Sequence, residues 1–117
     1  MFKSDIYRKG LCSEQKVQLY FLEKGYDVFT PIGGRTKCDF VACKPNETIR
    51  VQVKTASENG NGLQVRFDVN GKVQNRDTTD VYVVVYEDNM WMFPVEDCQQ
   101  TSRFMKHIGK FDKYKIA

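Results

Sequence analysis

Two short apolar runs joined by a polar turn constrain the fold of this 117-residue chain more than any other feature. Residues 38–43 read CDFVAC and residues 49–55 read IRVQVKT, and the segment between them includes Pro and Asn, which interrupt strands. Successive side chains of a strand point to opposite faces. The apolar residues of the second run therefore share one face, and Gln52 and Lys54 share the other. The two runs predict a β-hairpin that places Asp39, Gln52 and Lys54 on one surface of a sheet.

The polar surface of this hairpin has two interpretations. An antiparallel sheet commonly has one solvated face, so an acid, an amide and an amine there are consistent with ordinary surface residues. The same three groups are also suited to holding a divalent cation beside a phosphate, because such cations prefer oxygen ligands. The hairpin alone does not decide between these interpretations.

The segment SEQKVQLYFLEKG, which begins at Ser13, predicts one helix upstream of the hairpin. Ser13 is a favourable N-cap, and Gly25 is a favourable residue at which to end a helix. Glu14 then falls in the first turn, where a carboxylate complements the helix dipole. Val17 and Phe21 follow Glu14 by three and seven residues and share its face. If Val17 and Phe21 pack on the sheet, Glu14 points toward the sheet as well. Otherwise Glu14 only complements the helix dipole at the rim of the helix.

Together, these elements resemble the PD-(D/E)XK nuclease superfamily, which has the restriction-endonuclease-like fold. The resemblance covers somewhat under half of the chain and is greatest to the branch of small homing endonucleases and Holliday-junction resolvases. The order of elements is a helix with a Glu, a strand, a strand with an Asp, and a strand with Gln-x-Lys. The matching residues are Gly10, Ser13, Glu14, the GYDV of 25–28, Pro31, the DFV of 39–41 and the VQVKTA of 51–56.

Two residues depart from the family pattern. Cys38 stands where the motif name has Pro, which is a common variation. Gln52 stands where a second carboxylate is usual, and its amide oxygen can ligate a hard cation but brings no charge, so cation affinity is expected to fall. Some members of the resembled family, homing endonucleases among them, carry Gln here, and Glu14 could supply the missing negative charge.

The resemblance implies a metal-dependent DNA endonuclease that hydrolyses phosphodiester bonds with Mg²⁺, for which Mn²⁺ can substitute. The implied metal ligands are Asp39, the Gln52 side chain, the Val53 backbone carbonyl and Glu14. Lys54 is implied to orient or deprotonate the nucleophile or to stabilise the developing negative charge. The implied catalytic residues are thus Glu14, Asp39, Gln52 and Lys54.

Several functional alternatives stay open from the sequence. A homing endonuclease would read a long specific sequence, whereas a Holliday-junction resolvase would read branched DNA by its shape. A catalytically inactive DNA-binding module is favoured by Gln52 and disfavoured by the presence of Lys54 and Glu14. A protein-interaction domain without nucleic acid has less support than any of these.

The DNA-contacting residues and the assembly are expectations of the same kind. Arg35 and Lys37 lie in a loop before Asp39, where solvated charges are equally consistent, and the spacing of a phosphate-binding P-loop is absent. The candidate DNA-contacting residues are Arg35, Lys37, Arg50 and Arg76. One small domain carries one site, so cutting both strands requires a homodimer or a higher symmetric oligomer.

Length and composition predict one domain, residues 1–117, with a packed core. The apolar share is 41% and the aromatic share is 13%, and the net charge of +3 permits DNA binding without demanding it. No run approaches the ~20 apolar residues of a membrane span, and the N-terminus lacks an apolar signal region. The four cysteines form no C-x-x-C pair, which indicates reduced thiols in a cytoplasmic protein. A single histidine, His107, leaves nucleophilic triads and His-based zinc sites without their parts.

The second half of the chain predicts further strands. Residues 63–69 alternate between apolar and polar, which predicts a half-buried strand. Residues 80–86 are apolar almost throughout, which is typical of a central strand covered on both faces. Asp80 is expected to have a structural role at the start of this strand. The fold class is therefore α/β (α+β), a mixed and mainly antiparallel sheet with the helix of residues 13–24 packed on it.

The C-terminal tail, residues 101–117, is predicted to be helical or irregular. Its basic residues alternate with aromatic ones, which suits a nucleic-acid surface. The alternative is an amphipathic segment that places Phe104, Met105 and Ile108 in the core, and one segment can serve both purposes.

Overall fold

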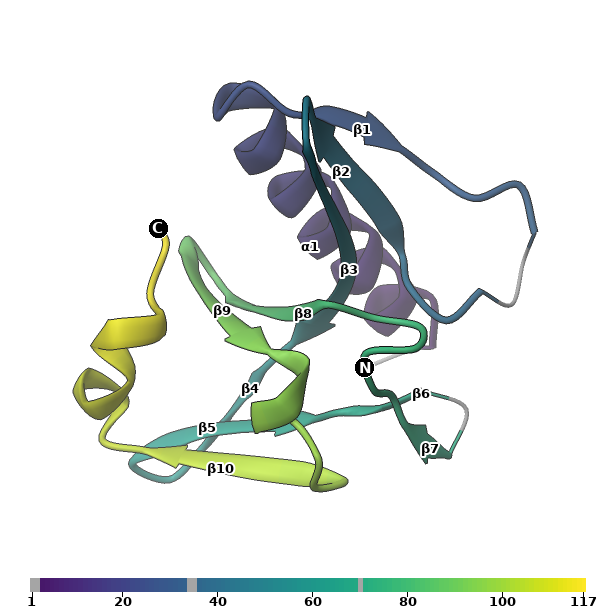
Figure 1. The fold of residues 1–117 in the computed structure, drawn as a ribbon. Helices are drawn as coiled ribbons and strands as arrows, with labels where there is room; N and C mark the ends of the chain where they lie inside the picture. Colours follow the sequence, from purple (N-terminus) through teal and green to yellow (C-terminus); the bar gives the residue numbers. More distant parts are fainter. Residues whose placement is uncertain (1–2, 34–35, 70) are drawn as a thin grey trace.

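A computed structural model describes residues 3–33, 36–69 and 71–117 of the chain (Figure 1). In chain order, its elements are α1 (Lys3–Glu23), β1 (Asp27–Phe29), β2 (Phe40–Lys44), β3 (Glu47–Thr55), β4 (Ser57–Asn59), β5 (Gly62–Arg66), β6 (Asp68–Val69), β7 (Lys72–Val73), β8 (Val81–Tyr86), β9 (Asn89–Pro94), the 3₁₀ turn η1 (Val95–Asp97), β10 (Ser102–Lys106) and the 3₁₀ helix η2 (Ile108–Tyr114). Within the described ranges, no helix combines the length and the apolar character needed to cross a membrane.

The central sheet has five strands in the order β1-β2-β3-β8-β9. Strands β3 and β8 run parallel, and the other neighbours run antiparallel. The hairpin predicted from the two apolar runs is β2–β3, with Phe40 opposite Val51. The prediction of a mixed, mainly antiparallel sheet is thus confirmed.

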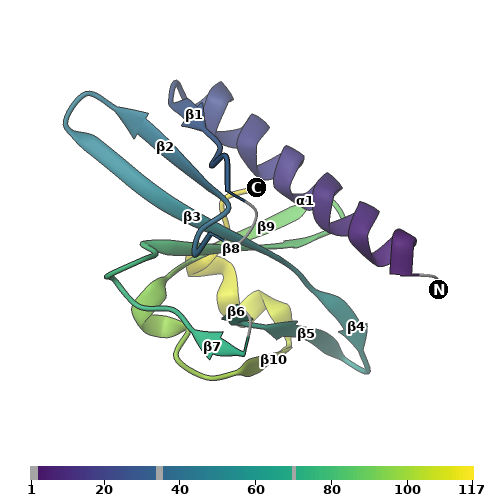
Figure 2. The same cartoon turned by 90° about the vertical axis from the view of Figure 1, so that its right-hand side faces the viewer.

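Two layers cover the central sheet, one on each face (Figures 1 and 2). On one face, α1 packs Val17 and Phe21 against apolar residues of β2, β3 and β8. On the other face, β5, β10, η1 and η2 enclose a second cluster that includes Tyr82 and Trp91. Strand β8 contributes to both clusters, which confirms the prediction of a central strand covered on both sides. Burial of these two apolar faces is the main force that holds the layers together.

The predicted start of the helix was wrong. Helix α1 begins at Lys3, ten residues before Ser13, so Glu14 lies in the middle of the helix and cannot complement the dipole at its N-terminus. Ser13 is 4% exposed, and its hydroxyl forms a 2.8 Å hydrogen bond with the Thr55 hydroxyl of β3. A serine is favourable as an N-cap, but it indicates the first residue of a helix only where the residues before it cannot themselves be helical. The preceding residues include no proline, and their single glycine is tolerated.

The C-terminal tail was also predicted incompletely. It contains a strand, β10, which pairs antiparallel with β5, and then η2. Met105 is fully buried, whereas Phe104 and Ile108 are 43% and 39% exposed, so the alternative that places all three residues in the core is correct for Met105 only. The strand alternates, so Met105 faces the sheet and its neighbour Phe104 faces away.

Candidate active site

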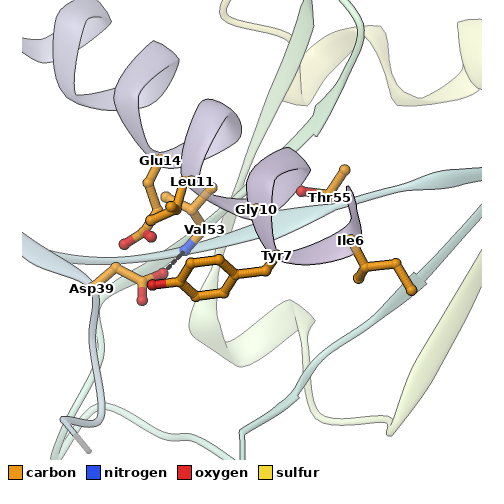
Figure 3. A pocket seen from close by; sticks show the side chains of 8 residues that line it. All are labelled: Ile6, Tyr7, Gly10, Leu11, Glu14, Asp39, Val53 and Thr55. Carbon is orange, nitrogen blue, oxygen red and sulfur yellow. Dashed lines mark hydrogen bonds between the residues drawn. The ribbon is translucent and has the colours of Figure 1, made fainter. Parts of the chain in front are cut away.

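Asp39 lies at the point where β2 and β3 separate. Its backbone N–H donates to the Val51 carbonyl at 2.8 Å, which continues the ladder of the hairpin by one residue. Beyond this point the Val53 N–H donates to Oδ2 of Asp39 at 2.7 Å, so a side-chain carboxylate takes the place of a ladder carbonyl (Figure 3). This bond holds the Asp39 carboxylate at the open edge of β3, whose last residues pair with β8 on the other side.

Glu14 reaches the same place from α1. Val17, one turn further along the helix, is buried against the sheet, and this packing turns Glu14 toward the sheet. Figure 3 shows the Glu14 and Asp39 side chains converging from the helix and from the start of β2. Both line a pocket of about 190 Å³. The lining residues are Ile6, Tyr7, Gly10, Leu11, Glu14, Asp39, Val53 and Thr55.

The two carboxyl groups perturb each other. The pKa of Glu14 is raised by burial, then by the negative charge of Asp39 and by a side-chain hydrogen bond with it. The pKa of Asp39 is also raised by burial, against the opposing effects of the Val53 N–H, the Lys54 charge and the Glu14 hydrogen bond. Two interacting, partly buried carboxyls favour keeping one proton between them. The same pair favours a cation, which removes their repulsion.

Lys54 lies on the opposite face of β3 from Val53 and is not among the residues that line this pocket, although its charge acts on Asp39. Its ammonium donates a 2.7 Å hydrogen bond to the Asp68 carbonyl of β6. Burial lowers the pKa of Lys54, while the charges of Asp68 and Asp39 act in the other direction. An ammonium has three donors, so the bond to Asp68 leaves two for a substrate.

Gln52 is buried, so the interpretation of it as an ordinary surface residue is wrong. Its side chain is 6% exposed, and its Oε1 has no hydrogen-bond partner among the residues that the structure describes. An acceptor buried in this way costs about 1–3 kcal/mol, and such groups in folded proteins usually have a water or an ion as partner. Gln52 precedes Val53 on β3, and it is the next residue after Val51, whose carbonyl binds the Asp39 amide.

The oxygen atoms at this site would suit a hard divalent cation better than a soft one. In the described part of the chain, no three His, Cys, Asp or Glu side chains gather as a metal site. The oxygen ligands available are therefore two carboxylates, an orphaned amide oxygen and backbone carbonyls. Oxygen-only sets with few charges and room for waters suit Mg²⁺ and related ions.

Two of the predicted DNA-contacting residues, Arg50 and Arg76, are not among the residues that line this pocket. Arg50 forms an ion pair with Asp80 at 2.9 Å and also donates to the Asp77 carbonyl. Arg76 pairs with Glu96 and contacts Asp80 at 3.4 Å. These partners within the chain favour a structural role for both arginines. Two further candidates remain: Lys37 is exposed, and Arg35 lies outside the described residues.

Asp80 has the structural contacts that its position predicts. It accepts hydrogen bonds from the Arg50 backbone N–H at 2.7 Å and from the Arg50 Nε at 3.0 Å. Arg50 is the main cause of its lowered pKa. Asp80 therefore ties the start of β8 to the neighbouring strand β3.

The sequence did not reveal the helical side of the pocket. Ile6, Tyr7 and Leu11 line it, but all three precede Ser13, the predicted start of the helix. A signal was present, because Ile6 and Gly10 precede Ser13 by seven and three residues, a spacing that keeps one helical face. Thr55 was also missed, since it ends its strand on the face predicted to be apolar.

Comparisons with known proteins bear on the family and the fold of this chain. The family model of PD-(D/E)XK endonucleases matches residues 5–113. The chain is 34% identical over 109 residues to Protein 5.3 of Escherichia phage T7, an alignment that covers 89% of this chain and 91% of that protein. The fold is similar to that of a bacterial homing endonuclease with a TM-score of 0.75 at 22% identity, over 92% of this chain and 83% of the other. The family match and the phage relative show that this chain belongs to the PD-(D/E)XK endonuclease family.

Proposed function

We propose that this protein is a metal-dependent endodeoxyribonuclease that hydrolyses phosphodiester bonds, in the manner of a homing endonuclease. One observation carries the proposal. Glu14 and Asp39, which belong to separate elements, converge in one pocket with raised pKa values, and the Lys54 charge acts on Asp39. Perturbed titratable groups gathered in a cleft are characteristic of active sites.

The cation of this site would be Mg²⁺ or Mn²⁺, held by oxygen ligands. Asp39, Glu14, the Gln52 Oε1 and the Val53 carbonyl are the proposed ligands. When bound, such an ion supplies Lewis-acid polarisation of the phosphate and makes a water more acidic.

The side chains of the protein have distinct proposed tasks. Asp39 is oriented by the Val53 N–H, so its free oxygen faces the pocket in a defined direction. Glu14 receives or holds a proton next to the reacting phosphate, as its raised pKa allows. Lys54 stabilises negative charge that develops on the phosphate, and its partial burial strengthens that interaction.

The test is cleavage of supercoiled plasmid and of a synthetic four-way junction, each with Mg²⁺ and with chelator. Wild type is expected to nick or linearise the plasmid only with Mg²⁺. Lys54→Met and Asp39→Asn are each expected to lose about 100-fold or more of the cleavage rate, the size of effect seen when one charge-stabilising group is removed. Lys24→Met is the matched control, because Lys24 is an exposed lysine in the turn that follows α1.

The substrates and variants also separate the alternatives. Preference for the junction over the plasmid would identify a resolvase. Binding of DNA without any cleavage in Mg²⁺ or Mn²⁺ would identify an inactive DNA-binding module, to which the uncharged Gln52 points. Cleavage that persists in Lys54→Met at the wild-type rate would contradict the proposed site.

A further inference from the structure

The first turns of α1 extend past the sheet on which the rest of the helix packs (Figure 2). The face of α1 that meets the sheet follows a helical spacing, and its residues are Ile6, Gly10, Ser13, Val17 and Phe21. Val17 and Phe21 are 0% and 1% exposed, whereas Ile6 is 60% exposed. The same helical face that is buried further along is therefore open at Ile6 and Gly10, directly beside the carboxyl pair.

Gly10 has no structural reason to be glycine. A glycine in the interior of a helix is destabilising relative to alanine. Its backbone does not have the left-handed conformation that favours glycine, and an added Cβ would meet no atom within 4 Å. Gly10 nevertheless lines the pocket, one turn before Glu14 (Figure 3). What the missing side chain provides is open space above Glu14 and Asp39.

The other residues of this open helical face suit a sugar or a base more than a phosphate. Tyr7 and Leu11 are 68% and 41% exposed, and none of the described residues that line the pocket carries a positive charge. In Figure 3 the Tyr7 ring lies along the mouth of the pocket with its hydroxyl directed toward Asp39. Aromatic rings at such positions stack on bases or sugars of a nucleic-acid strand.

We propose that Gly10 is a position of close approach for the DNA strand that carries the scissile phosphate. The inference rests on the proposed function, because a phosphate that reaches Glu14 and Asp39 brings its adjacent sugars against the open face of α1. Gly10 leaves room for this strand, and Tyr7 borders it. Gly10 is thus a positioning residue: the absence of a side chain leaves room for the DNA strand, and Gly10 contributes no chemical group to the reaction.

The test adds volume at Gly10 without weakening the helix. Alanine and leucine are strong helix formers, so Gly10→Ala and Gly10→Leu are expected to keep or raise the melting temperature. DNA binding and cleavage are expected to fall with side-chain volume, by about 100-fold in cleavage for Gly10→Leu, which is the effect of a displacement near 1 Å. Affinity is measured by the fluorescence anisotropy of a labelled duplex in the presence of chelator, and cleavage is measured in Mg²⁺.

Cys12→Leu is the matched control. Cys12 is exposed and lies on the same turn of α1, about 200° around the helix from Gly10, at 100° a residue. It is not among the pocket-lining residues, so the same leucine there is expected to leave affinity and cleavage at the wild-type level.

The affinity measurement decides the inference separately from the proposed function. Weaker binding in Gly10→Leu, with wild-type binding in Cys12→Leu, supports the close approach. Equal affinity of Gly10→Leu and wild type would overturn it, whether or not the DNA is cut. Wild type that binds but never cuts would refute the nuclease proposal while the affinity comparison still stands, and wild type that binds no DNA would refute both.

Discussion

At the scale of single residues, Gln52 stands out because its side chain is polar but buried. A buried amide acceptor without a partner is unfavourable, yet Gln52 Oε1 is such an acceptor in the described structure. Gln52 is not among the residues that line the pocket of Glu14 and Asp39, but it directly precedes Val53, whose N–H binds the Asp39 carboxylate. A cation bound at the Gln52 Oε1, as we propose, would give this acceptor the partner that it lacks among the described residues.

Gln52→Glu should therefore change the cation dependence of the protein. A second carboxylate adds charge to the ligands, so the Mg²⁺ concentration for half-maximal cleavage is expected to fall, on the order of tenfold. With chelator, the added buried charge is expected to lower the melting temperature, and Mg²⁺ is expected to restore it. Thermal unfolding with and without Mg²⁺ checks this.

Gln15→Glu is the control for that prediction, because it makes the same change at an exposed position of α1. A melting temperature of Gln52→Glu that falls equally with and without Mg²⁺ would show that no cation is bound near this side chain.

Asp80 is the second residue with a large expected effect. Its hydrogen bonds to Arg50 are charge-assisted, and Asp80→Asn is expected to lose about 1–3 kcal/mol of the free energy of unfolding. Because Arg50 lowers the folded-state pKa of Asp80, this stability is present above the unfolded pKa and is lost as the pH falls through the folded pKa. Urea unfolding of wild type and variant should therefore differ at neutral pH and converge in acid.

Glu96→Gln provides the comparison, since the Glu96–Arg76 pair is more than half exposed on both sides. Exposed pairs contribute little, so this variant should unfold almost as wild type does. An equal loss of unfolding free energy in Asp80→Asn and Glu96→Gln would show that the hydrogen bonds of Asp80 contribute no more than an exposed ion pair does.

At the scale of elements, the contact between β5 and β10 depends on Gly62. A Cβ added at Gly62 would lie 2.9 Å from the Lys106 Cα of the paired strand, closer than real Cβ atoms come. Gly62→Ala is expected to push β10 outward and to cost about 1–3 kcal/mol of stability, as overpacking does. The midpoint of urea unfolding measures this cost.

Gly109→Ala is the control for Gly62→Ala, because a Cβ there meets nothing within 4 Å. The prediction fails if the two alanine variants share one unfolding midpoint.

The elements also show what the sequence could and could not predict. Alternation along β3 placed Val51 and Val53 on the helix side and Lys54 on the other, because strand periodicity is a local property. The start of α1 was missed because Ser13 has the residue type of an N-cap, while its actual role is a hydrogen bond to Thr55, a residue distant in sequence. Strand β10 was missed because its pairing with β5 is likewise nonlocal. Burial of the Gln52 side chain was missed for the same reason.

At the scale of the whole molecule, the proposed site with Glu14 and Asp39 faces one strand of a DNA duplex, which has two. Cutting both strands is expected to require two copies related by symmetry. Nicked plasmid should therefore accumulate first at low protein concentration, and linear plasmid should increase more steeply than nicked plasmid as the protein concentration rises. Sedimentation with and without DNA measures the assembly directly, and linearisation in a single binding event by a monomer would contradict the expectation.

The amide proton of Val53 is a built-in reporter, because it points at the Asp39 carboxylate. In an NMR titration its resonance should shift as that carboxyl loses its proton, at a pH above the usual aspartate range, since burial raises the pKa of Asp39. An ion that binds the carboxylate would move the transition to lower pH. The Val53 amide resonance would thus report whether an ion is bound at Asp39 even when no DNA is present.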